Sequence, residues 1–259
     1  MKSVTILGGS SAGVGTGQGC SSYLVTIDDT HIVLDMGPDT LQELRKHVDF
    51  RKLDAIIISH LHMDHILDLF ALRFTLTYNP IKAERKTPLY LPPGGLAFFA
   101  QAAALFTTKN DNVQSYFSDV YELAEYDPTR EVIVGTTRIT FAPTVHVVPC
   151  WAIRMHPADG DDFVYTADAG TDSDLDAFVD GAALVVADSA AAPDASEATK
   201  RGVHFDAAAA AELANHAGAT HLVLTHQWEE NDPDRNAVIA ARHFDGEIDT
   251  AKPGLEVTW

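Results

Sequence analysis

The chain contains little cysteine and no long apolar run. Only two of its 259 residues are cysteines, Cys20 and Cys150, too few for the disulfide framework of a small secreted domain. We therefore expect both thiols to be reduced and structural. The first residues, Lys2 to Leu7, predict a strand rather than a signal segment, and no apolar run is long enough for a membrane span. These absences predict a cytoplasmic protein with no membrane partner.

Basic residues are also scarce. The chain has 18 Lys and Arg against 37 Asp and Glu, which gives a formal net charge of −19. Its densest basic segment, Lys82-Ala83-Glu84-Arg85-Lys86, is shorter than the clusters that bind a phosphate backbone. We therefore expect no long nucleic acid as a partner. The acidity indicates a solvated surface, and adaptation to salt is an alternative that nothing else in the sequence supports.

Six consecutive residues, His60-Leu61-His62-Met63-Asp64-His65, form the most informative motif. An apolar run that predicts a buried strand precedes them, and an apolar-rich stretch of helical length, Ile66 to Tyr78, follows. Side chains on such a loop converge on one point outside the carboxyl end of the strand. Neutral imidazole is the commonest zinc ligand, and Asp adds the charge that a second cation needs. The motif predicts a metal site, in preference to histidines that cap a helix or lie on a solvated loop.

Three later residues are candidates for completing the site, because each closes a strand-like run. They are His146 after Ile139 to Val145, Asp168 after Phe163 to Ala167, and His226 after Leu222 to Thr225. Sheet scaffolds often present a catalytic centre at strand ends. Cys150 follows His146 by four residues and is a further candidate ligand, although the set is complete without it.

The order of these residues, HxHxDH and then His, Asp and a strand ending in Thr-His, resembles the metallo-β-lactamase superfamily of metallohydrolases. Gly8-Gly9, the segment Val33-Leu34-Asp35-Met36-Gly37 and the closing segment Ala251 to Leu255 add to the similarity. The resemblance implies one domain over residues 1–259, with an α/β fold that is a four-layer αββα sandwich of two mixed β-sheets. It also implies the metal ligands: His60, His62 and His146 for one zinc, Asp64, His65 and His226 for the second, and Asp168 as the bridge.

A histidine outside these ligands narrows the resemblance to one branch. His204 precedes a predicted helix, Ala207 to His216, which Asp206 caps and Gly218 ends. It resembles the GHxT-type motif of the ribonuclease Z and phosphodiesterase branch, where the histidine helps to bind phosphate and to protonate the leaving oxygen. The match is partial, because Val203 separates Gly202 from His204, so an ordinary surface histidine is the alternative. Asp168 lies in Ala-Asp-Ala where the family prefers Gly-Asp-Thr, which puts only the surroundings of this ligand in question.

Alternating short strands and helices are expected along the chain. The predicted strands are Val4 to Leu7, Tyr23 to Ile27, His31 to Asp35, Ala55 to Ser59, Leu89 to Leu91, Ile139 to Ala142, Ala152 to Met155, Phe163 to Thr166, Leu184 to Ala187 and Leu222 to Thr225. The predicted helices are Thr40 to His47, Asp64 to Tyr78, Gly95 to Phe106, Leu175 to Asp180, Ala207 to His216 and Asn236 to Phe244. The glycine-rich segment 8–19 contains neither GxGxxG nor GK[ST], so it predicts a loop beside the metal site rather than a nucleotide-binding loop.

Together, these observations predict a zinc-dependent metallohydrolase that holds two Zn²⁺ ions. Mn²⁺ or Fe are alternatives, because Asp64 and Asp168 supply oxygen ligands. The predicted reaction is cleavage of a small, nucleotide-like phosphodiester by a metal-bound hydroxide. In it Asp64 orients the hydroxide and His204 protonates the leaving alkoxide.

A small phosphate-containing substrate is expected rather than tRNA. Only residues 147–167 separate His146 from Asp168, which leaves no room for the protruding arm of ribonuclease Z. Two alternatives stay open. The same metal site can hydrolyse a carboxylic or sulfuric ester, a lactone or a thioester, or the chain can be a scaffold without activity. A homodimer is the assembly to test.

Overall fold

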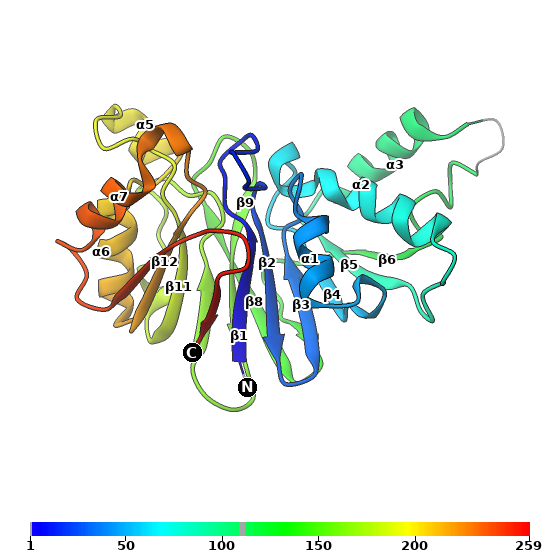
Figure 1. Cartoon of the computed structure of the whole chain (residues 1–259), viewed down its shortest axis with the longest axis horizontal. Coiled ribbons are helices and arrows are strands. Elements are labelled where there is room, and N and C mark those ends of the chain that lie inside the picture. Colours follow the sequence, from blue (N-terminus) through cyan, green and yellow to red (C-terminus); the bar gives the residue numbers. More distant parts are fainter. Residues whose placement is uncertain (1, 109–111) are drawn as a thin grey trace.

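The computed structural model of the chain describes residues 2–108 and 112–259. Within these residues, two seven-stranded β-sheets pack face to face, and helices cover both outer faces (Figure 1). The predicted αββα sandwich of two mixed sheets is therefore confirmed. No helix of the described segments is long and apolar enough to cross a membrane.

The first sheet contains mostly N-terminal strands. Its order is β14 (Glu256–Thr258), β1 (Lys2–Gly8), β2 (Ser22–Ile27), β3 (Thr30–Leu34), β4 (Ala55–Ile57), β5 (Thr87–Leu91) and β6 (Tyr121–Glu125). Strands β3 to β6 run parallel to one another, whereas β14, β1, β2 and β3 alternate in direction. Because β14 pairs with β1, the two ends of the chain lie side by side (Figure 1).

The second sheet follows in the C-terminal half of the chain. Its order is β13 (Glu247–Thr250), β12 (His221–Thr225), β11 (Ala182–Asp188), β10 (Asp162–Tyr165), β9 (Cys150–His156), β8 (Thr137–Thr144) and β7 (Val132–Val134). Strands β10 to β13 are parallel, and β7 to β10 alternate. The carboxyl ends of β8, β10, β11 and β12 consequently share one edge of this sheet.

Side-chain alternation with a period of two separates the layers. In β1, Val4 and Ile6 face the second sheet, whereas Leu7 faces the helices. In β11, Leu184 and Val186 point inward, and Val185 packs against the opposite helices. Three apolar clusters result, one between the sheets and one under each helical layer.

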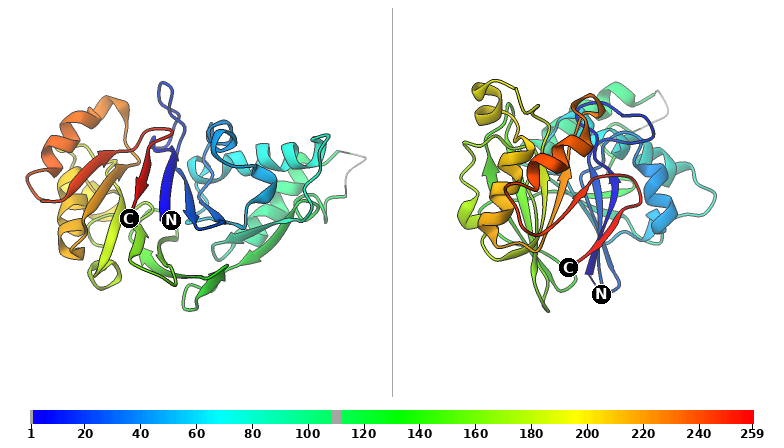
Figure 2. Two further views of the ribbon diagram at one scale, coloured as in Figure 1. Left: turned by 60° about the horizontal axis from the view of Figure 1, so that its bottom comes forward. Right: turned by 60° about the vertical axis from the view of Figure 1, so that its left-hand side comes forward.

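Helices α1 (Leu41–His47), α2 (Met63–Tyr78) and α3 (Gly95–Phe106) lie against the first sheet, while α4 (Asp176–Val179), α6 (Ala207–Ala217) and α7 (Pro233–Ala240) lie against the second. The remaining short elements are α5 (Glu197–Gly202) and the 3₁₀ turns η1 (Phe50–Lys52) and η2 (Glu229–Asn231). The two helical layers stay on opposite sides of the sandwich in all three ribbon views (Figures 1 and 2).

All the predicted strands and helices are present, but four strands and α5 were missed. The missed strands, β6, β7, β13 and β14, are the edge strands of the two sheets. An edge strand is paired on one side only and is half solvated, so it lacks the continuous apolar pattern that marks a central strand. The predicted helix Asn236 to Phe244 is shifted and spans Pro233–Ala240. It begins earlier because the Asp232 side chain accepts a hydrogen bond from the backbone of Arg235, and the residues after Ala240 form a turn. The predicted cap and stop of α6 are confirmed: Asp206 accepts from Ala209 N–H, and Gly218 has a φ of 67°.

The segment Asp35-Met36-Gly37 holds the start of α2 in place. Met36 N–H donates to His65 O over 2.7 Å, and Met36 O accepts from Asp68 N–H over 3.0 Å. Gly37 lies so close to the carbonyl oxygen of Asp64 that a Cβ atom added at Gly37 would overlap it. The glycine is therefore required by the close approach of two backbones, and the backbone that it contacts carries two of the predicted metal ligands.

Replacement of Gly37 by Ala should displace the first turn of α2. We expect Gly37→Ala to lower the free energy of unfolding by about 1–3 kcal/mol, as overpacking of a buried site does, and to lower the bound metal content. Urea denaturation and elemental analysis measure the two effects. Gly13→Ala is the matched control, because an added Cβ at Gly13 meets no heavy atom within 4 Å. Equal stability and metal content in both variants would contradict the account.

Candidate metal centre

The seven predicted ligand residues converge at one edge of the sandwich. His60 and His62 follow β4, and Asp64 and His65 occupy the first turn of α2. The three remaining residues follow strands of the second sheet: His146 after β8, Asp168 after β10 and His226 after β12. Donor atoms from these residues form two groups whose members lie within 4.8 Å of one another, and Asp168 belongs to both.

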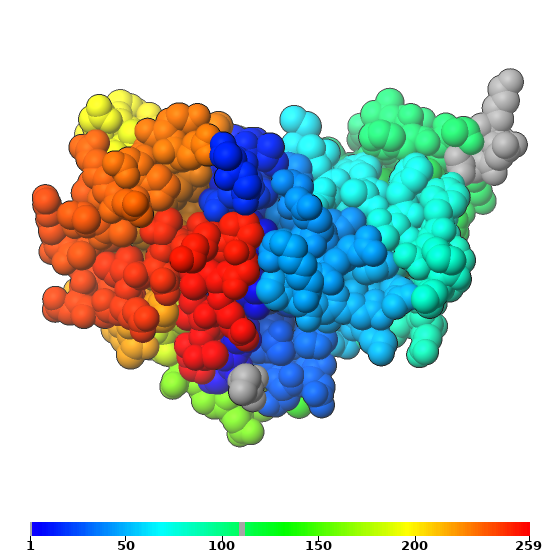
Figure 3. Space-filling model, in the orientation of Figure 1, coloured from blue at the N-terminus to red at the C-terminus, as the bar shows by residue number. Residues whose placement is uncertain are grey.

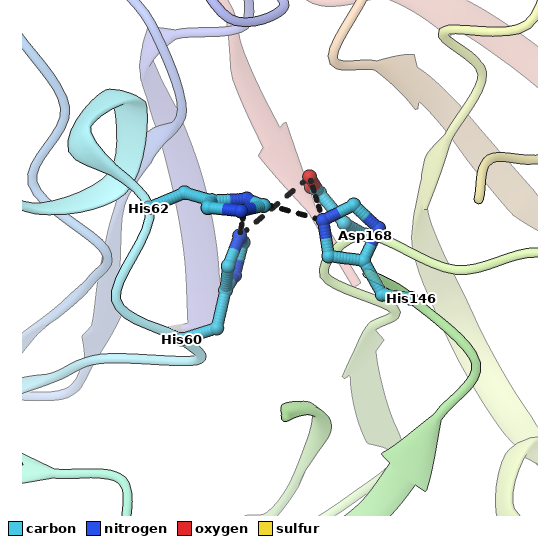
Figure 4. A group of neighbouring side chains, drawn as sticks. All are labelled: His60, His62, His146 and Asp168. Atoms are coloured by element: carbon cyan, nitrogen blue, oxygen red, sulfur yellow. Dashed lines mark hydrogen bonds and ion pairs between the residues drawn. The ribbon is translucent and has the colours of Figure 1, made fainter. Parts of the chain in front are cut away.

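In the first group, three imidazole nitrogens and one carboxylate oxygen face a common point (Figure 4). His62 Nδ1 lies 3.1 Å from His60 Nε2 and 3.1 Å from His146 Nε2. Asp168 Oδ2 lies 3.7 Å from the His60 nitrogen and 3.5 Å from the His146 nitrogen. The four atoms come from both sheets, so the centre exists only when the sandwich is closed.

The second group lies on the other side of Asp168. Asp64 Oδ2 is 3.1 Å from His226 Nε2 and 3.5 Å from His65 Nε2. Asp168 Oδ1 is 3.3 Å from His65 Nε2 and 3.6 Å from His226 Nε2. The two oxygens of Asp168 thus face different groups, which is the arrangement that a bridging carboxylate requires.

The donor spacing fits a small divalent cation. Ligands 2.0–2.1 Å from a tetrahedral zinc ion are about 3.3 Å from one another. The neighbouring donor atoms described above are 3.1 to 3.7 Å apart, and all donors within a group lie within 4.8 Å of one another. His65 Nε2 and Asp168 Oδ1 are buried and lack a hydrogen-bond partner among residues 2–108 and 112–259. Buried polar atoms without a partner are rare, and a cation between them would satisfy both.

Cys150 lies outside the converging donors. Its Sγ atom is 3.5 Å from His60 Nδ1, the ring nitrogen opposite the one that faces His62, and 3.4 Å from the carbonyl oxygen of Asp168. Burial raises the pKa of this thiol, which disfavours the thiolate that binds metals. Both cysteines are free and buried, as the sequence predicted.

The ring nitrogens that point away from the centre are fixed by neighbouring groups. His65 Nδ1 is 2.7 Å from Asp35 Oδ2, His146 Nδ1 is 3.0 Å from Val203 O, and His60 Nδ1 is 3.0 Å from Ser59 Oγ. Such contacts set which nitrogen carries the proton and leave the other free to act as a ligand. The imidazoles are therefore oriented toward the centre by the protein itself.

The ionisation of the site matches a cation-binding role. Burial lowers the pKa of His60 well below its ordinary value, so this imidazole is neutral. Burial opposes ionisation of Asp64, but hydrogen bonds from His226 and His65 outweigh it and hold the Asp64 pKa far below its usual range. Burial likewise opposes a charge on His226, yet Asp168, Asp188 and Asp64 raise its pKa to about 10. Without a cation, ionised carboxylates therefore face a protonated His226, and a cation bound between them would replace that proton.

Three residues of the site have left-handed backbone conformations. Asp35, Ala167 and His226 have φ values of 54°, 52° and 57°. Such a conformation costs a residue with a Cβ about 1–2 kcal/mol. Ala167 occupies the place where the resembling family prefers glycine, and its positive φ gives the physical reason for that preference. The strain indicates that the strand ends are bent to aim their side chains.

Sequence reasoning gave no role to Asp35, which it named only as part of the family signature, and it missed the buried carboxylate of Asp188. Asp35 accepts hydrogen bonds from Ser59 and Tyr165 as well as His65. Asp188 ends β11, and its Oδ2 atom lies 2.8 Å from His204 Nδ1. A carboxylate directly after an apolar strand was the signal used for Asp168, and the run Leu184 to Ala187 before Asp188 carries the same signal.

His204 lies at the rim of the centre. Its ring centroid is 5.1 Å from that of His146 and 5.2 Å from that of His226. Burial lowers the His204 pKa, but the carboxylate of Asp188 outweighs it, so the net shift is upward. The structure thus brings His204 to the site although the motif around it is incomplete.

Comparison with known proteins agrees with the fold and with the donor residues described above. A profile described as the beta-lactamase superfamily domain matches residues 30–227. The probable metallo-hydrolase YhfI of Bacillus subtilis is 30% identical over 97% of this chain and 98% of its own length. The crystal structure of YhfI, a metallo-beta-lactamase fold protein, covers 99% of this chain and 98% of its own with a TM-score of 0.86 and 28% identity.

Two further proteins are less similar to this chain in sequence. Ribonuclease Z of Haloarcula marismortui is 27% identical over 299 aligned positions that span 98% of this chain and 95% of that protein. The crystal structure of a diphosphatase from the PhnP family has the same fold, with a TM-score of 0.74 and 21% identity over 100% of this chain and 98% of its own.

Metal content provides the direct test of the ligand set. As purified, the protein should hold about two metal ions per chain, and His60→Ala should lower both occupancy and stability, since metal binding is coupled to folding. Elemental analysis and thermal unfolding measure these effects. His216→Ala, a change at an exposed histidine far from both donor groups, is the control. Stoichiometric metal in a His60→Ala/Asp168→Ala double variant would show that the ligands are wrongly assigned.

Proposed function

Because the chain belongs to the β-lactamase superfamily of metallohydrolases, we propose that it is a phosphodiesterase that cleaves a small, nucleotide-like substrate. The observation that carries this proposal is the position of His204, whose imidazole lies at the rim of the metal centre and pairs with the buried carboxylate of Asp188. Hydrolysis of a phosphodiester releases an alkoxide, and a protonated imidazole at this place can supply the proton that the alkoxide needs.

We assign two divalent cations to the two donor groups, with Asp168 between them. Imidazole dominates both groups, which favours zinc, and the oxygens of Asp64 and Asp168 keep Mn²⁺ and Fe as alternatives. When bound, such a pair supplies positive charge toward phosphate oxygens and lowers the pKa of water. His60, His62 and His146 would hold one ion, and Asp64, His65 and His226 the other.

Asp64 has a second role besides that of a cation ligand. Its Oδ2 atom accepts a hydrogen bond of 3.0 Å from the backbone N–H of Ala12, in the glycine-rich loop. The carboxylate is thus fixed from outside the donor group, and it can orient a nucleophile by accepting a hydrogen bond from it. This contact brings the glycine-rich loop beside the donor groups. In Figure 3 the N-terminal segment (dark blue) lies at the surface between later parts of the chain drawn in orange and in light blue.

His204 is held in the orientation that a general acid requires. Asp188 Oδ2 binds the Nδ1 side of the ring, so the proton on Nε2 is the one available to a substrate. Asp188 is itself buried and fixed, because it accepts hydrogen bonds from the backbone N–H groups of Ala169 and Ala190. The raised pKa keeps the ring protonated at a higher pH than that of an ordinary histidine.

The size and charge of the molecule favour a small substrate. Residues 147–167 form β9, β10 and short connections and contain no protruding arm. The alignment with the Haloarcula ribonuclease Z is 299 positions long, whereas this chain has 259 residues, so that protein carries at least 299 − 259 = 40 residues that are absent here. A net charge of −19 repels a long polyanion.

A substrate panel tests the reaction class. Bis(p-nitrophenyl) phosphate should be cleaved faster than nitrocefin, an aryl sulfate or a lactone, and precursor tRNA should be a poor substrate. Initial rates with the metal-loaded enzyme at matched concentrations give the comparison. Faster cleavage of the lactone or the sulfate would move the function to ester hydrolysis by the same site. Efficient, salt-sensitive processing of precursor tRNA would show that the charge argument fails.

Replacement of His204 tests the general acid. For a substrate with a poor leaving group, His204→Ala should lower kcat by about a hundred- to ten-thousand-fold, while the metal content stays intact. The loss should shrink with p-nitrophenolate, which departs without a proton. Asp188→Asn should show the same dependence on the leaving group with a smaller loss, because the ring stays in place but loses its partner.

The control for this experiment is His243→Ala, since His243 pairs with Glu212 away from the centre. Full activity of His204→Ala on the poor-leaving-group substrate would reduce His204 to a rim residue without a chemical role.

A further inference from the structure

The chain contains three tryptophans, and the core uses two of them. Trp151 and Trp259 pack against the apolar cluster between the sheets, each beside a second aromatic ring. Trp228 is 40% exposed, and within residues 2–108 and 112–259 it belongs to none of the three apolar clusters. A single exposed apolar side chain is common on proteins, so the surroundings of Trp228 decide whether it has a role.

The backbone on both sides of this tryptophan is fixed to the glycine-rich loop. Gln227 N–H donates to Gly9 O over 2.9 Å, and Gln227 O accepts from Ser11 N–H over 3.2 Å. One residue after the tryptophan, Glu229 accepts a hydrogen bond of 2.9 Å from the backbone N–H of Thr16. A side chain that projects from a rigid backbone is pre-organised for a ligand, because little conformational entropy is lost on binding.

Trp228 points to the same side of its segment as the metal ligand His226. Gln227 lies between them and is extended, since it forms a parallel bridge with Ser10. Side chains two residues apart in an extended segment share a face, and their Cα atoms are about 6.6 Å apart. Gln227 and Glu229 instead line a cavity on the other side, against β13. The indole therefore lies beside the second donor group.

The segments that carry Trp228 and His204 are attached to the same loop after β11. Asn231 Nδ2 donates to Ala190 O over 3.0 Å, and Ala191 N–H donates over 3.0 Å to the carbonyl oxygen of the residue after His204. The ring of His204 is also 5.2 Å from the ring of the metal ligand that precedes Trp228 by two residues. A leaving group that takes a proton from His204 is thus within reach of the indole.

The charge around Trp228 disfavours a second anionic group on the substrate. The sequence after it, Glu-Glu-Asn-Asp-Pro-Asp, contains four acidic residues in six, and residues 202–234 contain no Lys or Arg. A phosphate or carboxylate beside the indole would be repelled by this charge. A neutral ring would not be, and the flat face of an indole binds such a ring by stacking.

We propose that Trp228 is the stacking surface for a neutral, planar ring on the leaving group, such as the base of a nucleoside. This inference rests on the proposed phosphodiesterase activity and specifies which part of the substrate the protein recognises. The phosphate lies at the metal centre, the leaving oxygen faces His204, and the ring lies against the indole. Trp228 contacts the substrate without taking part in bond cleavage, so it sets affinity and selectivity.

Competitive inhibition of the metal-loaded enzyme tests the stacking. Adenosine 5′-monophosphate carries a planar base, and ribose 5-phosphate is the same molecule without the base. With bis(p-nitrophenyl) phosphate as the reporter, Trp228→Ala should raise the Ki of adenosine 5′-monophosphate about five- to a hundredfold, as removal of an aromatic partner of a base does. The Ki of ribose 5-phosphate should stay the same. The KM of the reporter should also rise, with kcat unchanged, since its ring stacks equally in the ground and transition states.

Two further variants control this experiment. Trp228→Phe should retain most of the affinity for adenosine 5′-monophosphate, because a phenyl ring also stacks. Ile133→Ala, at a residue of the edge strand β7 that is 58% exposed, should change neither Ki. Circular dichroism and elemental analysis verify that each variant is folded and loaded with metal. Equal rises of both Ki values in Trp228→Ala, or no change in either, would overturn the proposal.

Tryptophan fluorescence separates this inference from the proposed function, because a titration needs no turnover. Adenosine 5′-monophosphate should quench the emission of the metal-loaded wild-type protein, and Trp228→Phe, which keeps Trp151 and Trp259, should remove the quenching. A wild-type protein that binds the nucleotide in this way but hydrolyses no phosphodiester would contradict the proposed function alone. Quenching that is absent from the wild-type protein, or that persists in Trp228→Phe, would overturn the role of Trp228.

Discussion

The buried carboxylate of Asp35 is the interaction on which the rest of the site depends. It accepts hydrogen bonds from Ser59 N–H and Ser59 Oγ, both over 2.7 Å, from His65 Nδ1 over 2.7 Å and from Tyr165 OH over 2.8 Å. These donors come from the residue directly before the HxHxDH loop, from α2 and from β10 of the opposite sheet. One side chain thus connects the two sheets and orients a metal-facing imidazole. Loss of one partner of a buried, hydrogen-bonded charge costs about 3–5 kcal/mol, which is a large fraction of the stability of a domain.

The site is assembled from strand ends that the sandwich forces together. The backbones of Asp35, Ala167 and His226 are in left-handed conformations that only a rigid surrounding structure can maintain. The same bends direct Asp168 and His226 toward the HxHxDH loop of the other sheet. In the second donor group the oxygens of Asp64 and Asp168 each lie beside the nitrogens of His65 and His226, so opposite charges face one another there. The geometry that suits a pair of cations is therefore a property of the closed sandwich and of the strain at its edge.

Helix α2 connects the site to the surface. Its first turn presents Asp64 and His65 to the centre, and Asp68 and Arg73 hold α1 and the Tyr116 carbonyl. The charged side chains of α2 point toward the protein interior, and the exposed positions of the helix are all apolar.

The sequence by itself determined the elements whose signals are local. The HxHxDH loop, the period-two strands, the Asp206 cap and the Gly218 stop depend on neighbours a few residues away, so their patterns were sufficient. His146, Asp168 and His226 could be proposed because each follows an apolar run, although only the resemblance to a family grouped them. The four edge strands were missed because one-sided pairing leaves a weak apolar pattern.

Tertiary structure decided what depends on residues distant in the chain. Asp35 and Asp188 acquire their partners His65 and His204 only when separate segments meet, and Cys150 falls behind the His60 ring only when β9 packs in place. The apolar outer face of α2 likewise appears only once the sheet has taken the other face of the helix. Burial and contact across the sandwich are set by the whole fold, and no local pattern carries them.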